Sequence, residues 1–318
     1  MWVPTLVRTL MLVGLVLASR PTRSASGPPM GWNSWDAYGF TIDEQAFKAN
    51  GTELAALRSY GWTYAVIDEG WYMDNPRGAN LPERSYQLNA AGLLTPSIKR
   101  YPSAIDDAGF KPLADWVHSR GLKFGLHVVR GIPRQAVERN TPISGSPFHA
   151  ADAADTNETC PWDDGNFGVQ DNAAGQAYYD SMVRLYAQWG VDFLKVDCIS
   201  ANPFRATEIR QIHEAIQKAG RPIVLSLSPG PAPLERVDFL KRNAQMWRIS
   251  NDVWDGWQLA GDTHSAGFPF GISSAFDNLA EWNAFAGRGA WPDVFAVNGQ
   301  AHRVARHGQR QGMAGDHV

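Results

Sequence analysis

Two aspartates, Asp197 and Asp252, each follow a short apolar stretch that is typical of a buried β-strand. Two carboxyl groups that face each other can cleave a glycosidic bond, because one attacks the sugar or activates water while the other protonates the leaving oxygen. Aspartates that follow strands also serve as helix N-caps, and the spacing alone leaves both roles open.

The neighbours of the two aspartates differ in kind. Lys195 lies two residues before Asp197, on the same face of the predicted strand, and its charge favours the ionised carboxylate that a nucleophile requires. Asp252 lies close to Asp255 and to three tryptophans. The tryptophans are Trp247, Trp254 and Trp257. We expect this apolar and acidic neighbourhood to raise the pKa of Asp252, which suits an acid/base.

Short apolar runs alternate with amphipathic stretches, which is the pattern of βα units around a parallel sheet. Strands are predicted near 30–35, 64–67, 124–129, 193–196, 223–227 and 246–249, with a seventh starting near 291. Helices are predicted over 42–60, 110–120, 176–189, 209–219, 234–242 and 276–285. Polar residues at or just past strand ends are Asp68, Glu69, His127, Asp197, Ser228 and Asp252. Only a closed (β/α)8 barrel brings so many strand ends to one mouth, so we expect an α/β fold of the TIM-barrel type.

The composition narrows the classes of partner. The 318 residues have a formal net charge of −3 and are 44% hydrophobic, which is ordinary for a globular protein and gives no reason to expect nucleic acid. No Cys/His spacing suggests a metal site, and no glycine-rich dinucleotide fingerprint follows the first strand, so no metal or organic cofactor is expected. Most of the thirteen Trp residues are expected in the core, and some on the walls of a sugar site.

Both ends of the chain differ from the rest. Arg8, the apolar run 10–18 and the small residues that follow predict a signal peptide over 1–25, so we expect a secreted or periplasmic protein, free of the membrane after cleavage. Residues 26–295 are expected to form one barrel domain. Residues 296–318 contain no Leu, Ile, Phe, Trp or Tyr and show no periodicity, which predicts a disordered tail.

The chain has two cysteines, Cys160 and Cys198. Export would allow a disulfide between them, and two free buried thiols are the equally open alternative. The sequence does not set the oligomeric state, and a homo-oligomer is compatible with it.

Four motifs, in order along the chain, resemble one enzyme family. The motifs are PMGWNSW (29–35), IDEGW (67–71), LKVD (194–197) and WRISND (247–252). They resemble the opening strand, the acidic sugar-binding motif, the nucleophile strand and the acid/base segment of melibiase-type α-galactosidases, glycoside hydrolase family 27. The similarity runs from 29 to about 293, and the four motifs together are more specific than any one of them.

The resemblance implies a barrel, a carbohydrate substrate, no cofactor and a retaining double displacement that releases terminal α-D-galactosyl residues. By this similarity Asp197 is the nucleophile and Asp252 the acid/base, with carboxyl groups about 5–5.5 Å apart. The implied substrate-binding residues are Trp35, Asp68, Glu69, Trp71, His127, Lys195, Ser228 and Arg248. The acidic pair would accept hydrogen bonds from sugar hydroxyls, Lys195 would donate one, Arg248 would reach the sugar or the acid/base, and the two tryptophans would form apolar walls.

Several positions depart from the family pattern. Glu69 stands where the family usually has a second Asp, and the segment 228–231 (SPGP) replaces one that shapes the pocket near the second sugar carbon. β-L-Arabinopyranose and α-N-acetylgalactosamine are therefore alternative glycones. His127 stands where many relatives have tyrosine, and a structural histidine is an equally open role.

The resemblance also stops after Asp293. We therefore expect the end of the barrel and the family's C-terminal β-sandwich to be missing from this chain. An inactive carbohydrate-binding remnant is the alternative that follows from such a truncation.

Overall fold

The computed structural model describes residues 27–76, 84–254, 256–259 and 271–294. The predicted signal peptide, the predicted tail and Asp255 lie outside the described residues, so the expectations about them stay predictions. Within the described ranges, no helix combines the length and the apolar composition needed to cross a membrane.

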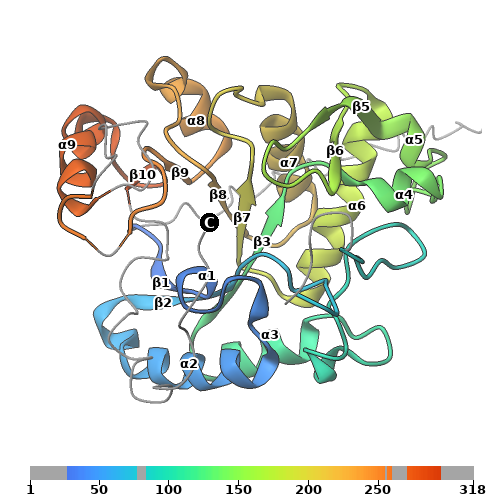
Figure 1. The fold of residues 1–318 in the computed structure, drawn as a ribbon, viewed down its shortest axis with the longest axis horizontal. Coiled ribbons are helices and arrows are strands. Elements are labelled where there is room, and N and C mark those ends of the chain that lie inside the picture. Colours follow the sequence, from blue (N-terminus) through green and yellow to red (C-terminus); the bar gives the residue numbers. More distant parts are fainter. Residues whose placement is uncertain (1–26, 77–83, 255, 260–270, 295–318) are drawn as a thin grey trace, which may run out of the picture.

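A parallel sheet of seven strands forms the centre of the fold. In spatial order its strands are β1 (Met30–Asn33), β2 (Trp62–Ile67), β3 (Lys123–Val129), β7 (Phe193–Asp197), β8 (Val224–Leu227), β9 (Met246–Arg248) and β10 (Trp291–Asp293). The sheet curls so that its two end strands, β1 and β10, both lie on the left of Figure 1. The seven strands match the predicted ones, and the barrel-type fold class is confirmed.

The strands are apolar because both faces of a parallel sheet are covered. Ala65, Val66 and Ile67 of β2 have no exposed surface, and β3 and β7 are similarly buried. The register between β3 and β7 pairs His127 with Lys195. Polar side chains within these apolar strands are therefore brought side by side at one level of the sheet.

Helices follow the strands and lie around the curled sheet (Figure 1). They are α1 (Trp35–Tyr38), α2 (Glu44–Ala56), α3 (Lys111–Ser119), α6 (Ala173–Trp189), α7 (Ala206–Lys218), α8 (Val237–Asn243) and α9 (Ile272–Trp282). Local interactions explain where α6 begins and ends. The Asn172 side chain accepts a hydrogen bond from the Gly175 amide at the start, and Gly190 ends the helix in a left-handed conformation. The predicted helices are confirmed, with bounds that shift by a few residues.

A second, small sheet was not predicted from the sequence. Its antiparallel strands have the order β4 (Ile132–Pro133), β6 (Asn166–Val169) and β5 (Ala154–Thr159), and α4 (Arg134–Glu138) and α5 (Ala150–Ala153) lie in the same insertion (Figure 1). The insertion separates β3 from α6 along the chain.

A disulfide bond joins this insertion to the main sheet. Cys160 directly follows β5 and Cys198 directly follows β7, and their Cα atoms are 5.9 Å apart. The structure thus decides between the two states that the sequence left open for these cysteines.

Candidate active site

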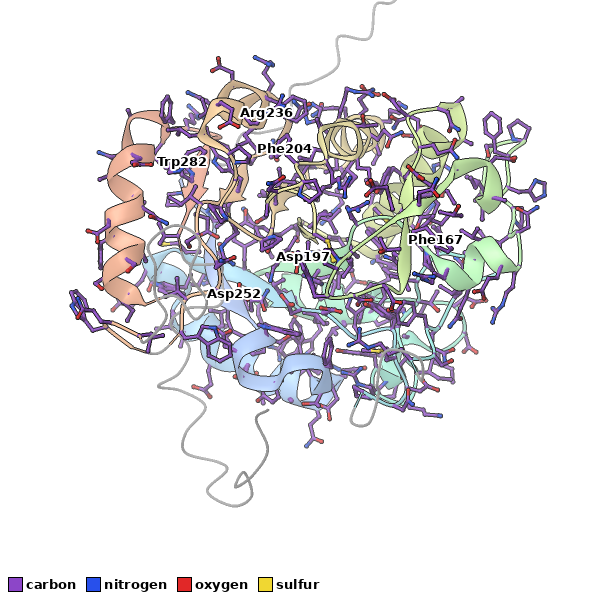
Figure 2. The ribbon with its side chains drawn as sticks, turned by 45° about the horizontal axis from the view of Figure 1, so that its top comes forward. Phe167, Asp197, Phe204, Arg236, Asp252 and Trp282 are labelled. Atoms are coloured by element: carbon purple, nitrogen blue, oxygen red, sulfur yellow. A yellow bond between two sulfur atoms is a disulfide. The ribbon has the colours of Figure 1, made fainter. Side chains whose placement is uncertain are left out.

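A cavity of about 550 Å³ opens at the carboxyl ends of the parallel strands, where barrel enzymes have their active sites. Its lining residues are Trp35, Phe40, Asp68, Glu69, Arg84, Trp162, Lys195, Asp197, Ser228, Pro229, Asn251 and Asp252. Figure 2 shows the two aspartates Asp197 and Asp252 near the middle of the molecule, between α9 and the small sheet that includes Phe167. Seven of the ten predicted site residues line this one cavity, the two proposed catalytic aspartates among them.

Asp197, the last residue of β7, has donors on both carboxylate oxygens. The Cys198 amide donates to Oδ1 at 2.7 Å, and His127 Nε2 lies 3.4 Å from Oδ2. Burial alone would raise the pKa of Asp197, but the hydrogen bond from His127, the charges of His127 and Lys195, and the Cys198 amide outweigh burial and lower it. The carboxylate is therefore kept ionised, as the position of Lys195 predicts for a nucleophile.

Asp68, just past β2, is the most heavily hydrogen-bonded acid of the site. Its Oδ2 accepts from Asn33 Nδ2 at 2.6 Å and from Lys195 Nζ at 2.9 Å, and its Oδ1 accepts from the Glu69 amide at 2.9 Å. Burial opposes its ionisation, but the charges of His127 and Lys195 and these hydrogen bonds hold the pKa of Asp68 well below its usual value. A buried, charged pair of Asp68 and Lys195 thus forms the floor of the cavity.

Lys195 remains a cation at this depth because several acids surround it. Burial works against its charge, yet Asp68, Asp197 and Asp252 raise its pKa. Its ammonium group can therefore donate hydrogen bonds to a sugar while it also neutralises part of the acidic cluster.

Asp252 lies after β9, lines the same cavity and is 38% exposed. Arg248 Nη1 donates to its Oδ1 at 3.0 Å, which agrees with the predicted reach of Arg248 to the acid/base. The predicted aromatic surrounding is not observed: Trp247 is fully buried against Trp282, and Trp257 is 64% exposed and contacts Phe276. Neither ring lines the cavity, and the apolar neighbourhood of Asp252 stays a prediction.

Trp71 does not form a wall of the cavity, contrary to the prediction. Its side chain has no exposed surface and packs on Phe110, Tyr186 and Trp189, and its Nε1 donates to the His127 carbonyl at 2.8 Å. The predicted role is wrong because the turn after β2 directs this ring into the core, where it contacts β3 through its hydrogen bond to His127.

His127 lies in β3, between two acids. Its Nε2 is 3.4 Å from Asp197 Oδ2 and 3.9 Å from Asp68 Oδ1, while its Nδ1 has no hydrogen-bond partner within the described part of the chain. It does not line the cavity, so the structure shows it in contact with Asp197 and not on the surface that a sugar would reach.

Five lining residues were missed in the sequence: Phe40, Arg84, Trp162, Pro229 and Asn251. Trp162 follows Cys160 by two residues, so its place at the cavity depends on the disulfide and the small sheet. Arg84 lies on an irregular segment that no periodicity marks. Asn251 and Pro229 adjoin predicted site residues, which is the one signal that could have identified them.

Among the residues that the structure describes, no group of three or more His, Cys, Asp or Glu side chains is placed to hold a metal ion. The acids of the cavity are instead matched with Lys195, Arg84 and Arg248. The arrangement can provide one ionised carboxylate, a second carboxyl group across the cavity, and charged hydrogen-bonding groups for hydroxyls between them.

Comparison with known proteins identifies the same family as the motifs. A family model described as alpha galactosidase A matches residues 162–310, past the point where the motif resemblance ends. The α-galactosidase A of Cellvibrio japonicus (strain Ueda107) is 25% identical over 292 residues, which cover 91% of this chain and 59% of that protein. The human α-N-acetylgalactosaminidase is 28% identical over 272 residues, which cover 79% of this chain and 54% of that protein.

Solved structures agree with these relatives. A β-L-arabinopyranosidase of glycoside hydrolase family 27 from Geobacillus stearothermophilus has a TM-score of 0.78 and 46% identity, and the match covers 85% of this chain and 60% of that one. This chain therefore spans about three fifths of the length of such relatives. The motifs, the strand order and these similarities agree: the chain is similar to the melibiase-type α-galactosidases, glycoside hydrolase family 27.

Proposed function

We propose that this chain is a retaining glycoside hydrolase that releases terminal α-D-galactosyl residues from oligosaccharides or glycans. The observation that supports the proposal most directly is that Asp197 and Asp252 line one cavity together with Asp68, Glu69 and Lys195. The α-galactosidases among its relatives support the same substrate class.

In the first step, a carboxylate oxygen of Asp197 attacks the anomeric carbon and forms a glycosyl–enzyme bond. The bond from that carbon to the glycosidic oxygen breaks, and the oxygen takes its electron pair and a proton from Asp252. The lowered pKa of Asp197 keeps the attacking group ionised. In the second step, Asp252 removes a proton from water, the water oxygen binds the anomeric carbon, and the Asp197 carboxylate leaves.

The proposal is tested with a panel of p-nitrophenyl glycosides. We expect turnover of the α-galactoside, and proton NMR during the reaction should show that the first sugar released has the α configuration. A folded chain that binds galactose but cleaves none of the glycosides would instead support the inactive carbohydrate-binding remnant. A first product of β configuration would reject the retaining mechanism.

A β-L-arabinopyranoside is the second candidate substrate, and one position in this chain favours it. The Geobacillus β-L-arabinopyranosidase is 46% identical to this chain. Glu69, which lines the cavity, is one methylene longer than the Asp that is usual in the family. Arabinopyranose lacks the hydroxymethyl group of galactose, so a cavity with a longer acid suits the smaller sugar. α-N-Acetylgalactosaminide completes the panel as the third glycone.

Glu69→Asp is expected to shift the preference toward galactose, because a shorter side chain frees space in the cavity wall. One methylene changes discrimination by about 10- to 200-fold, so we expect the ratio of kcat/KM for the α-galactoside over the β-L-arabinopyranoside to rise about tenfold. Both constants are measured on one preparation, so the ratio does not depend on the folded fraction. A ratio that is unchanged or lower would show that Glu69 does not select the glycone.

The proposal also includes export, with removal of residues 1–25 and a secreted or periplasmic location. The Cys160–Cys198 disulfide supports it, since such bonds persist in oxidising compartments. N-terminal sequencing of the mature chain tests this part, and sedimentation analysis tests whether copies of the chain form a homo-oligomer.

A further inference from the structure

Asp163 is a buried acid behind the cavity wall, in the connection between β5 and β6. It is 2% exposed and does not line the cavity. Three donors surround its carboxylate: Arg84 Nη1 at 2.9 Å from Oδ2, and the Tyr86 hydroxyl at 3.2 Å and the Gly165 amide at 2.9 Å from Oδ1. Both oxygens of the Asp163 carboxyl group are therefore engaged as hydrogen-bond acceptors.

Glu69, which lines the cavity, lacks such a set. It is 5% exposed, and its Oε1 has no hydrogen-bond partner among the residues that the structure describes. Arg84 Nη1 is 3.8 Å from this oxygen, which is beyond hydrogen-bonding distance, and the same nitrogen is bound to Asp163. One guanidinium nitrogen thus lies between two buried carboxyl groups and bonds only one of them.

The charged groups around Glu69 also disfavour the ionised form of its carboxyl group. The ionisable groups that face it or its immediate neighbours are Asp68, Tyr72, Arg84, Tyr86, His127, Asp163, Lys195 and Asp197. Lys195 is bonded to Asp68, and Arg84 gives its hydrogen bond to Asp163, so Glu69 has only the longer ion pair with Arg84 at 3.8 Å. A buried charge that is so weakly paired is costly, and a proton removes that cost.

We propose that Asp163 is a positioning residue that holds a proton on the Glu69 carboxyl group. In this arrangement one Glu69 oxygen donates its proton to Asp163, and Oε1 remains as an oriented acceptor for a sugar hydroxyl. Burial, the hydrogen bond with Asp163 and the charges of Asp163, Asp197 and Asp68 all raise the pKa of Glu69, which agrees with the geometry.

The proton also affects the nucleophile. A neutral Glu69 removes one negative charge from the neighbourhood of Asp197, so Asp197 can ionise at lower pH. Asp163 would in this way influence catalysis without contact with the substrate. The part of the inference that concerns catalysis rests on the proposed hydrolase function; the protonation of Glu69 does not.

Infrared spectroscopy of the full chain tests the protonation directly. At neutral pH we expect a band in the carbonyl-stretch region of protonated carboxylic acids, which Glu69→Gln removes. Asp163→Asn should also remove it, because the Asn amide donates to Glu69 and stabilises its ionised form. Asp164→Asn is the matched control, since Asp164 is an exposed neighbour paired with Arg134, and it should leave the band and the activity unchanged.

The pH dependence of kcat/KM provides a second readout. Asp163→Asn should move the acidic limb to higher pH by about one unit, because an ionised Glu69 raises the pKa of Asp197. In the Glu69→Gln background, Asp163→Asn should not move this limb, since Gln cannot ionise.

The outcomes separate the two proposals. Absence of the wild-type band, or its persistence in a folded Asp163→Asn variant, would overturn the inference whether or not the chain is active. If Asp163→Asn does not fold, the Glu69→Gln variant alone is decisive. An infrared band and an acidic limb of the pH profile that Glu69→Gln leaves unaltered would overturn the inference as well. A chain with the expected band but without turnover of any glycoside would reject the hydrolase function alone.

Discussion

Asp197→Asn is expected to lower kcat/KM for an aryl α-galactoside by at least about a thousandfold, because the amide cannot form the glycosyl–enzyme bond. The variant should fold, since Asn keeps the shape and an acceptor for the Cys198 amide. Initial rates and thermal unfolding of the same preparation measure the two effects separately.

A complementary experiment identifies the attacking group. Asp197→Ala supplied with azide should form a galactosyl azide of β configuration, because azide then attacks the face that Asp197 occupies. Asp115→Asn is a control on the surface of α3, where Asp115 pairs with Lys111, and should behave as wild type. Activity of the Asp197→Asn variant above about a tenth of wild type would assign the nucleophile to another residue.

Asp252→Asn is expected to have an effect that depends on the leaving group. For a galactosyl disaccharide, whose leaving alcohol must be protonated, kcat/KM should fall by about 10²- to 10⁴-fold. For galactosyl fluoride, whose leaving group needs little proton donation, the fall should be much smaller. Rates for both substrates with wild type and variant give the comparison.

The structure indicates how Asp252→Asn should be controlled. Arg248 donates to Asp252, so removal of the charge also leaves a buried guanidinium with a weaker partner. Asp277→Asn on the exposed side of α9 changes a charge near this region without such a contact, and should affect neither substrate. Equal losses for disaccharide and fluoride would mean that Asp252 positions the sugar and is not the acid/base.

The central sheet was predictable because its signal is local. Each parallel strand is an apolar run that ends in a polar residue, as at Ile67–Asp68 and Val196–Asp197, and such ends meet at one mouth. The same rule predicted Ser228 at a strand end, and Ser228 lines the cavity.

Other parts of the site depend on contacts between distant segments, which the periodic pattern of the sequence does not predict. Trp162 and Asp163 reach the cavity region through a small sheet whose strands are short and partly polar, and Arg84 follows no periodic element. The inward direction of Trp71 is set by the ring cluster beneath it, although its motif position suggested the sugar. The contact between Arg248 and Asp252 was predicted, but the directions of the nearby tryptophans were not.

The Cys160–Cys198 disulfide affects both the stability of the fold and the geometry of the cavity. It closes a loop between positions 38 apart, a restraint that lowers the entropy of the unfolded chain by the equivalent of about 4 kcal/mol. Cys198 also donates its amide hydrogen to Asp197 from a left-handed backbone conformation, and Cys160 lies two residues before Trp162. Oxidation of one thiol pair therefore stabilises the fold and, at the same time, ties together the two chain segments that bring Asp197 and Trp162 to the cavity.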